Sequence, residues 1–166
     1  MQVNIALLTV TDTRTLDTDK SGKILVKKIN DQKHKLIDRK LVKDEKILIK
    51  KILSEWIKKD NIDVIITTGG TGLTGRDITP EALDEIADKH IPGFGEVFRT
   101  ISLKTVGTSS IQSRACAVLA NGKYIFALPG SSGGVTDAWD QILIHQLDIN
   151  HKPCNFVELF PRLKEK

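Results

Sequence analysis

Three aspartates, Asp12, Asp44 and Asp77, stand in segments that follow predicted strands, and the segment of Asp77 begins with a run of glycines. In a parallel α/β sheet, ligands bind outside the carboxyl ends of the strands, so these segments are where chemistry is expected. Carboxylates suit a hard divalent cation such as Mg²⁺, and the backbone N–H groups of a glycine-rich segment suit an anion. The pattern therefore predicts a site for an anionic substrate and a metal ion.

The segment from 70 to 75 reads GTGLTG and formally matches the GxGxxG fingerprint of dinucleotide-binding proteins. That fingerprint follows the first strand and opens a helix, whereas here it follows the third predicted strand and the next helix begins only at Thr79. About 20 residues further on, Glu96 falls in a predicted helix and not at a strand end that could hold a ribose. The chain also has no GxxxxGK[ST] P-loop. A phosphate or pterin cradle of a different design is the interpretation that remains.

Each aspartate also has an ordinary structural explanation. A functional Asp77 beside a bound phosphate implies a cation between the two, but an Asx turn or a charge near a helix N-terminus accounts for it as well. Asp44 stands where a helix N-cap belongs. Asp12 lies in a sequence typical of a turn. The functional interpretation of Asp44 and Asp77 depends on both lying at the same edge of the sheet.

Hydrophobic periodicity alternates between strand and helix patterns without a repeat or a low-complexity linker, which is typical of an α/β fold. We expect strands over 3–10, 36–42, 63–68 and 123–128, and helices over 20–30, from 44, from 79, and over 94–103, 110–120 and 134–147. Helices between successive strands predict a mainly parallel sheet with right-handed crossovers. Within it, 36–42 should lie nearer an edge and 63–68 should be central, with Trp56 and Trp139 in the core.

The length of 166 residues predicts a single domain over 1–166, with 150–166 as a C-terminal tail. The net charge is +4, with 25 basic and 21 acidic residues, and it comes from dispersed lysines. This mild excess suits an anionic small molecule and falls short of the clustered basic face of a duplex binder. An aromatic content of 5% also argues against stacking on single-stranded nucleic acid. We therefore expect no nucleic-acid partner.

The chain shows no signal peptide pattern and no run of about 20 apolar residues, so we expect no membrane partner. Its two cysteines, Cys116 and Cys154, form no CxxC pair, and reduced thiols are the default for such usage. His151 lies three residues before Cys154, but two candidate ligands without a second pair are more often incidental than a zinc site. These features predict a cytoplasmic protein.

Four blocks of the sequence resemble the molybdopterin-binding MoaB/MogA family. They are TGGTGLTGRDITPEA at 68–82, PGFGEVFR at 92–99, Ser113-Arg114, and PGS at 129–131. The blocks occur in the family's order over nearly the whole chain, and together they are far more specific than a lone GGTG. The resemblance implies a three-layer αβα sandwich with a mainly parallel sheet, assembled as a homotrimer or a homohexamer.

The resemblance also implies an activity. Active members of the family are adenylyltransferases that transfer AMP from Mg-ATP to the terminal phosphate of molybdopterin, releasing pyrophosphate and preparing the pterin for molybdate insertion. Asp44 and Asp77 match the catalytic pair of such members and would hold Mg²⁺ against the phosphates of ATP. A non-catalytic molybdopterin-binding or carrier protein of the same pathway is the alternative. In either case a molybdate-insertion protein is a candidate partner.

A wider set of residues is expected to contact substrate or nucleotide. The set comprises Thr11, Asp12, Gly69, Gly70, Thr71, Gly72, Glu96, Ser113, Arg114, Pro129, Gly130 and Ser131. Alternatives stay open for three of them. Glu96 could pair with Arg99 on one helix face, Arg114 could form a structural salt bridge, and Ser113 could be a small residue at a close contact.

Overall fold

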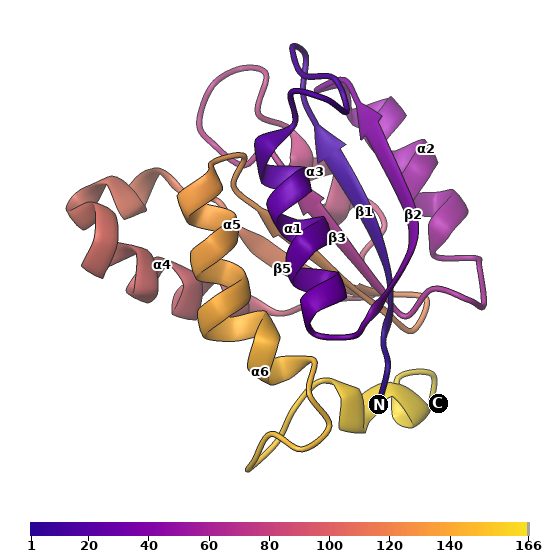
Figure 1. Ribbon diagram of the computed structural model, residues 1–166. Helices are drawn as coiled ribbons and strands as arrows, with labels where there is room; N and C mark the ends of the chain where they lie inside the picture. Colours follow the sequence, from indigo (N-terminus) through magenta and orange to yellow (C-terminus); the bar gives the residue numbers. More distant parts are fainter. Residues whose placement is uncertain (166) are drawn as a thin grey trace.

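The computed structural model describes residues 1–165 as a six-stranded sheet with helices on both faces (Figure 1). The strands are β1 (Asn4–Val10), β2 (Lys35–Val42), β3 (Val64–Thr68), β4 (Lys89–His90), β5 (Cys116–Ala120) and β6 (Lys123–Leu128). Their order is β2-β1-β3-β6-β5-β4. Strands β2, β1, β3 and β6 run parallel, whereas β5 is antiparallel to both β6 and β4. The predicted mainly parallel sheet, with β2 at an edge and β3 inside it, is confirmed.

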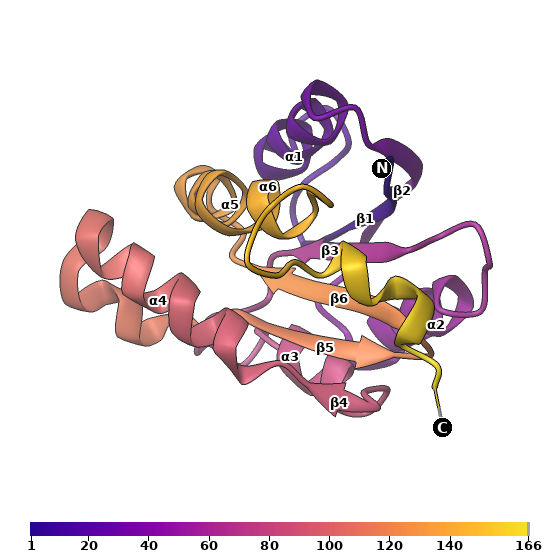
Figure 2. The ribbon, with the colours of Figure 1, turned by 90° about the horizontal axis from the view of Figure 1, so that it is seen from below.

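The helices form the two outer layers of the predicted three-layer sandwich (Figure 2). They are α1 (Lys20–Asp31), α2 (Lys46–Trp56), α3 (Thr79–Asp84), α4 (Pro92–Val106), α5 (Ser132–Ala138), the π-helical turn η2 (Trp139–Leu143) and α6 (Ile144–Gln146), with 3₁₀ turns η1 (Gly107–Gln112) and η3 (Val157–Arg162). Side chains of α1, α4 and α5 share one core with the sheet, and those of α2 and α3 share the other. The αβα architecture expected from the sequence is confirmed.

Strand β1 shows why the sheet needs both helical layers. Its side chains alternate between the two cores, with Leu7 facing α1 and α5 and Leu8 facing α2, and both are fully buried. A strand buried on both faces reads as a continuous apolar run, as in the sequence IALLTV. Trp56 closes one core and Trp139 the other, each almost completely buried as predicted.

The prediction of a helix over 110–120 is wrong. Strand β5 occupies Cys116–Ala120 and forms a hairpin with β6 through the two-residue turn Asn121-Gly122. Both turn residues have positive φ angles, 48° and 72°, as a type I′ hairpin turn requires. The short apolar run AVLA has no periodicity that separates strand from helix, but the Asn-Gly that follows it is a hairpin signal.

The N-cap expected at Asp44 is wrong, and the helix expected from Thr79 has its N-cap one residue earlier. Helix α2 begins at Lys46 with Glu45 as its N-cap, so Asp44 lies one residue outside the helix and does not cap it. Helix α3 begins at Thr79 itself, and Ile78 is its N-cap. The Thr79 hydroxyl donates instead to the carbonyl of Gly69 (2.9 Å). Asp44 therefore belongs to the loop after β2, and the Thr79 side chain ties the first turn of α3 to the glycine-rich loop.

The expected C-terminal tail packs against the sheet over its described part. The rings of Phe156 and Phe160 lie 4.6 and 5.8 Å from that of Tyr124 on β6. The final residue of the predicted tail, Lys166, lies outside the described residues. Within residues 1–165, no helix combines the length and apolar character needed to cross a bilayer.

Candidate functional site

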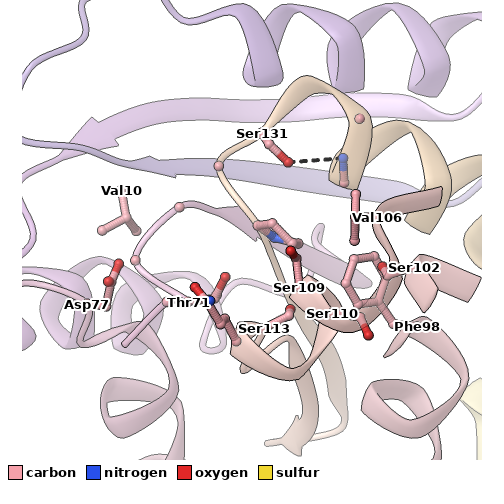
Figure 3. Close-up of a pocket in the computed structure, with 18 of the residues that line it drawn as sticks. Val10, Thr71, Asp77, Phe98, Ser102, Val106, Ser109, Ser110, Ser113 and Ser131 are labelled. Atoms are coloured by element: carbon pink, nitrogen blue, oxygen red, sulfur yellow. Dashed lines mark hydrogen bonds between the residues drawn. The ribbon is translucent and has the colours of Figure 1, made fainter. Parts of the chain in front are cut away.

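A pocket of about 940 Å³ lies at the carboxyl ends of the parallel strands (Figure 3). The segments that follow β1, β2, β3 and β6 all line it. They contribute Thr11, Asp44, residues 69–72 and 76–77, and Pro129 with Ser131. Asp77 lies toward one end of the pocket and Phe98, on α4, toward the other (Figure 3). The expectation that these segments converge on one edge is confirmed.

The glycine-rich loop lies directly against two of the aspartates. Gly70 has a φ of +68°, and a Cβ there would lie 3.1 Å from Oδ1 of Asp44 and 2.4 Å from the Thr79 hydroxyl. A Cβ on Gly72 would lie 2.7 Å from Oδ2 of Asp77. Glycine is therefore needed at both positions, because any side chain would displace a carboxylate or strain the loop. The loop backbone and the two carboxylates form one compact unit.

Hydrogen bonds within the loop hold the Asp77 carboxylate. Its Oδ2 accepts from the backbone N–H of Thr74 (2.8 Å) and from the Thr74 hydroxyl (2.7 Å). Burial alone would raise the pKa of Asp77, but these bonds outweigh burial and the pKa falls below its usual value. Asp77 is therefore ionised near neutral pH and fixed in orientation. The Asx-like turn considered from the sequence exists, and it does not remove Asp77 from the pocket.

The pKa of Asp44 shifts in the opposite direction, above its usual value. Burial raises its pKa, and the neighbouring charges of Asp12 and Asp77 raise it further, against a lowering effect of Arg76. The negative charges of Asp12 and Asp77 thus disfavour the ionised form of Asp44. A cation bound beside Asp44 would therefore favour its ionised form.

Asp12 is held by its neighbours. Its carboxylate accepts two hydrogen bonds from the guanidinium of Arg76, each of 2.9 Å, and one from the backbone N–H of Asp44 (3.2 Å). The Arg76 hydrogen bond is the main reason that the pKa of Asp12 lies below its usual value. Asp12 thus ties the loops after β1, β2 and β3 together at the pocket. The turn expected around it is present, with Thr11 accepting from the N–H of Arg14 (3.1 Å).

Two predicted binding residues do not line this pocket. The guanidinium of Arg114 donates to the carbonyls of Gly72 (2.7 Å) and Asp77 (2.8 Å) and pairs with Glu81, so it supports the glycine-rich loop from outside. The structural salt bridge weighed from the sequence is the arrangement found for Arg114. Glu96 is exposed on α4, beside a separate small cavity.

The position of Glu96 follows from helix geometry. Phe98, two residues later, lines the pocket, and two residues correspond to about 200° of rotation about a helix, so Glu96 lies on the other side of α4. The pair with Arg99, an alternative left open by the sequence, does not form, because Arg99 donates to the carbonyls of Ser113 (3.3 Å) and Ala115 (3.0 Å).

The remaining predicted residues line the pocket, some with their polar groups already bonded. The Ser131 hydroxyl accepts from the backbone N–H of Gly134 (3.1 Å) and so caps α5 (Figure 3). The Ser113 hydroxyl accepts from the N–H of Ala115 (3.3 Å). Both hydroxyls keep their hydrogens free to donate to a ligand.

One wall of the pocket was not predicted from the sequence. Helix α4 contributes Phe98, Ser102, Thr105 and Val106, and η1 adds three further polar residues: Ser109, Ser110 and Gln112. Residues 98, 102, 105 and 106 share one helical face, since their spacing is three or four residues. Small polar side chains at that spacing, next to apolar ones, were the signal available in the sequence, but the predicted helix ended at 103.

The donor set at the acidic end suits Mg²⁺. Asp44 and Asp77 offer hard carboxylate oxygens beside backbone N–H groups of the glycine-rich loop. Among residues 1–165, no three His, Cys, Asp or Glu side chains are grouped as a complete metal cage. Mg²⁺ is usually held in this way, by one or two carboxylates together with waters and substrate phosphates.

Comparisons with known proteins agree with this geometry. Residues 6–149 match the family model described as a probable molybdopterin binding domain. Molybdenum cofactor biosynthesis protein B of Escherichia coli K12 is 44% identical over 161 residues, which cover 97% of this chain and 93% of that protein.

Two solved structures are similar in fold over most of their length. A crystal structure of a molybdenum cofactor biosynthesis protein B superposes with a TM-score of 0.89 at 36% identity, covering 100% of this chain and 98% of the other. The tungsten cofactor synthesizing protein MoaB from Pyrococcus furiosus gives a TM-score of 0.77 at 35% identity, covering 87% and 92%. With its glycine-rich loop, its strand-end aspartates and these relatives, the chain belongs to the MoaB/MogA family of molybdenum cofactor biosynthesis proteins, which carry the probable molybdopterin binding domain.

Proposed function

We propose that the protein acts in molybdenum cofactor biosynthesis by transferring AMP from Mg-ATP to the terminal phosphate of molybdopterin. The observation that carries this proposal is the placement of Asp44 and Asp77 against Gly70 and Gly72 of one loop. A carboxylate pair beside a phosphate-binding loop is the arrangement that phosphoryl transfer needs, because the reaction depends on positioning and charge neutralisation.

The reaction balances without a further reactant. A phosphate oxygen of molybdopterin attacks the α-phosphorus of ATP, a new P–O–P bond forms, and the bond to the β-phosphate breaks, so that pyrophosphate leaves. Mg²⁺, held by Asp44 and Asp77, supplies charge neutralisation for the phosphates when it is bound. The chain orients the reacting groups through the N–H groups of the loop and the hydroxyls of Ser113 and Ser131. No protein base is required, since the attacking phosphate is already an anion.

Asp77 and Asp44 have different tasks in this scheme. Asp77 is fixed by Thr74 and has a lowered pKa, so it supplies a permanent negative charge at the metal. Asp44, with its raised pKa, is the carboxylate whose ionisation gains most from a bound cation. Metal binding should therefore lower the pKa of Asp44.

The test is to incubate the purified protein with molybdopterin and Mg-ATP and to measure adenylylated pterin and pyrophosphate. Formation of both products in equal amounts supports the proposal. Binding of molybdopterin without any product would instead identify a carrier of the pterin and contradict the enzymatic claim. If the protein is the enzyme proposed here, its adenylylated product is passed to the protein that inserts molybdate.

We also propose the trimeric or hexameric assembly expected from the family resemblance. Its support in this chain is a set of exposed apolar side chains along α4 and η1: Val97 (49% exposed), Leu103 (53%), Val106 (55%) and Ile111 (76%). Exposed apolar groups gathered on one protruding element are typical of contact surfaces. Sedimentation should give a trimer or a hexamer at micromolar concentration, and a monomer would contradict this part of the proposal.

A further inference from the structure

A second, smaller pocket of about 270 Å³ adjoins the first at the ends of β1 and β3. The two pockets share four lining residues, Val10, Thr11, Gly130 and Ser131. Its volume lies below the range of about 300–1,000 Å³ for pockets that enclose a whole drug-sized ligand. It is therefore suited to one group of a larger molecule whose remainder occupies the neighbouring pocket.

The smaller pocket is lined by two basic side chains that have no partner within residues 1–165. Arg14 and Lys20 are both exposed, and no hydrogen bond or ion pair joins either side chain to a described residue. The hydroxyl-bearing Ser132 lies on the same wall. Basic side chains in a concave site that also offers hydroxyl donors are suited to an anion.

One acidic residue lines this pocket, and its charge is already matched. Asp19 is 1% exposed and accepts hydrogen bonds from the Thr9 hydroxyl (2.6 Å), the Gly22 N–H (2.9 Å) and the Arg39 guanidinium (2.9 Å). The Asp19–Arg39 pair is neutral as a unit. The charge that remains is that of Arg14 and Lys20.

The two pockets therefore differ in the sign of the net charge that lines them. The larger pocket has Asp12, Asp44 and Asp77 with Arg76, which leaves it net negative at that end. We propose that the smaller pocket, defined by Arg14, Lys20 and Ser132, binds a phosphate or pyrophosphate group of the substrate. The source of that group is either the β- and γ-phosphates of ATP or the terminal phosphate of molybdopterin. That the group belongs to a substrate, and the choice of its source, rest on the proposed function; the binding of phosphate or pyrophosphate itself does not.

The binding of inorganic phosphate and pyrophosphate, measured by calorimetry at constant ionic strength, tests the pocket without any turnover. The double variant Arg14→Gln/Lys20→Gln should bind pyrophosphate at least about tenfold more weakly, because it loses both charged donors to the anion. Lys27→Gln is the matched control, because Lys27 is exposed on the same helix and does not line the pocket. Equal affinity in the double variant and the control would overturn the proposal.

The same variants separate the two sources. Weaker binding of ATP and pyrophosphate with unchanged binding of AMP assigns the pocket to the nucleotide's β- and γ-phosphates. Weaker binding of molybdopterin with unchanged binding of ATP assigns it to the pterin phosphate. If the wild-type chain binds pyrophosphate through Arg14 and Lys20 but forms no adenylylated pterin, the proposed function fails while the pocket assignment stands. Circular dichroism confirms that the variants are folded.

Discussion

Arg76 donates two hydrogen bonds to Asp12, from Nε to Oδ2 and from Nη2 to Oδ1, each of 2.9 Å. The pair links the glycine-rich loop to the segment after β1. Both side chains are in contact with solvent, so the ion pair itself contributes little to folding. Its greater effect is electrostatic, because the positive charge of Arg76 beside Asp44 partly offsets the rise in the pKa of that carboxyl.

Removal of this charge should change the pH dependence of activity. In Arg76→Gln the pKa of Asp44 rises further, because burial and Asp12 are no longer opposed by the guanidinium. Asp44 must be ionised to hold a metal, so activity is lost as pH falls through its pKa. The acidic limb of the pH–rate profile should therefore move to higher pH. The control Arg162→Gln, at an exposed pair with Glu165, should leave the profile unchanged; an unmoved limb in Arg76→Gln would show that Asp44 does not control it.

Arg114 should matter for stability. Its guanidinium bonds the carbonyls of Gly72 and Asp77 and pairs with Glu81, so Arg114→Ala leaves a partly buried carboxylate and two carbonyls without their donor. We expect a loss of about 2–3 kcal/mol in the free energy of unfolding, measured with urea. Arg114→Lys should restore little of this stability. The single ammonium nitrogen of lysine lacks the planar, forked donors with which the guanidinium reaches three acceptors at once. Full stability in Arg114→Ala would contradict this role.

Gly72 should be required for activity through the space that it leaves for Asp77. A Cβ at position 72 would lie 2.7 Å from Oδ2 of Asp77, so Gly72→Ala must displace the carboxylate. We expect a fall in activity of about 100-fold, comparable to the loss of one transition-state donor. Gly75→Ala is the matched control in the same loop, because a Cβ there meets nothing within 4 Å. Similar activities for the two variants would argue against a precisely placed Asp77.

His34 should make folding sensitive to acid. The side chain is 7% exposed, its Nδ1 accepts from the N–H of Val3 (3.3 Å), and burial lowers its pKa. The folded state therefore holds His34 neutral, while the unfolded chain takes up a proton at its ordinary pKa of about 6.5. The stability that depends on neutral His34 is fully present above the unfolded-state pKa, and it is lost as pH falls through the lowered pKa of the folded state.

Urea unfolding at about pH 7.5 and about pH 5.5 measures the effect, since these values bracket the ordinary histidine pKa. The wild-type chain should lose more stability between them than His34→Asn, whose amide oxygen can accept from Val3 but does not titrate. His90→Asn, at an exposed histidine, should behave like the wild type. An equal pH dependence in all three proteins would show that His34 is not responsible.

The sequence was sufficient for the parts of the fold that depend on long periodic segments. Strand β1 and helix α1 follow the predicted ranges closely, because a buried apolar run and an amphipathic helix each give a clear period. Strand β5 was missed because AVLA is too short to show a period, and the antiparallel hairpin depends on Asn121-Gly122. Two-residue β4 depends on pairing with β5, which local sequence does not encode.

Part of the candidate site was also predictable from the sequence, and part of it was not. The rule that ligands bind at strand ends was enough to predict the convergence of Asp12, Asp44 and Asp77. It could not predict that Arg114 would support the loop from outside, because its partners are two carbonyls and Glu81 from distant segments. The wall formed by α4 was missed because it depends on how that helix packs beside the sheet.

The central claim is that Asp44 and Asp77 together hold the metal for adenylyl transfer, and the Mg²⁺ dependence of pyrophosphate release tests it most directly. The rate is measured with molybdopterin and ATP for the wild type, Asp44→Asn, Asp77→Asn and, as a control, Asp60→Asn, which lies outside the pocket. We predict that each site variant is slower by about 100-fold or more and needs more Mg²⁺, while the control matches the wild type. Unchanged rates and Mg²⁺ dependence in both site variants would contradict the claim.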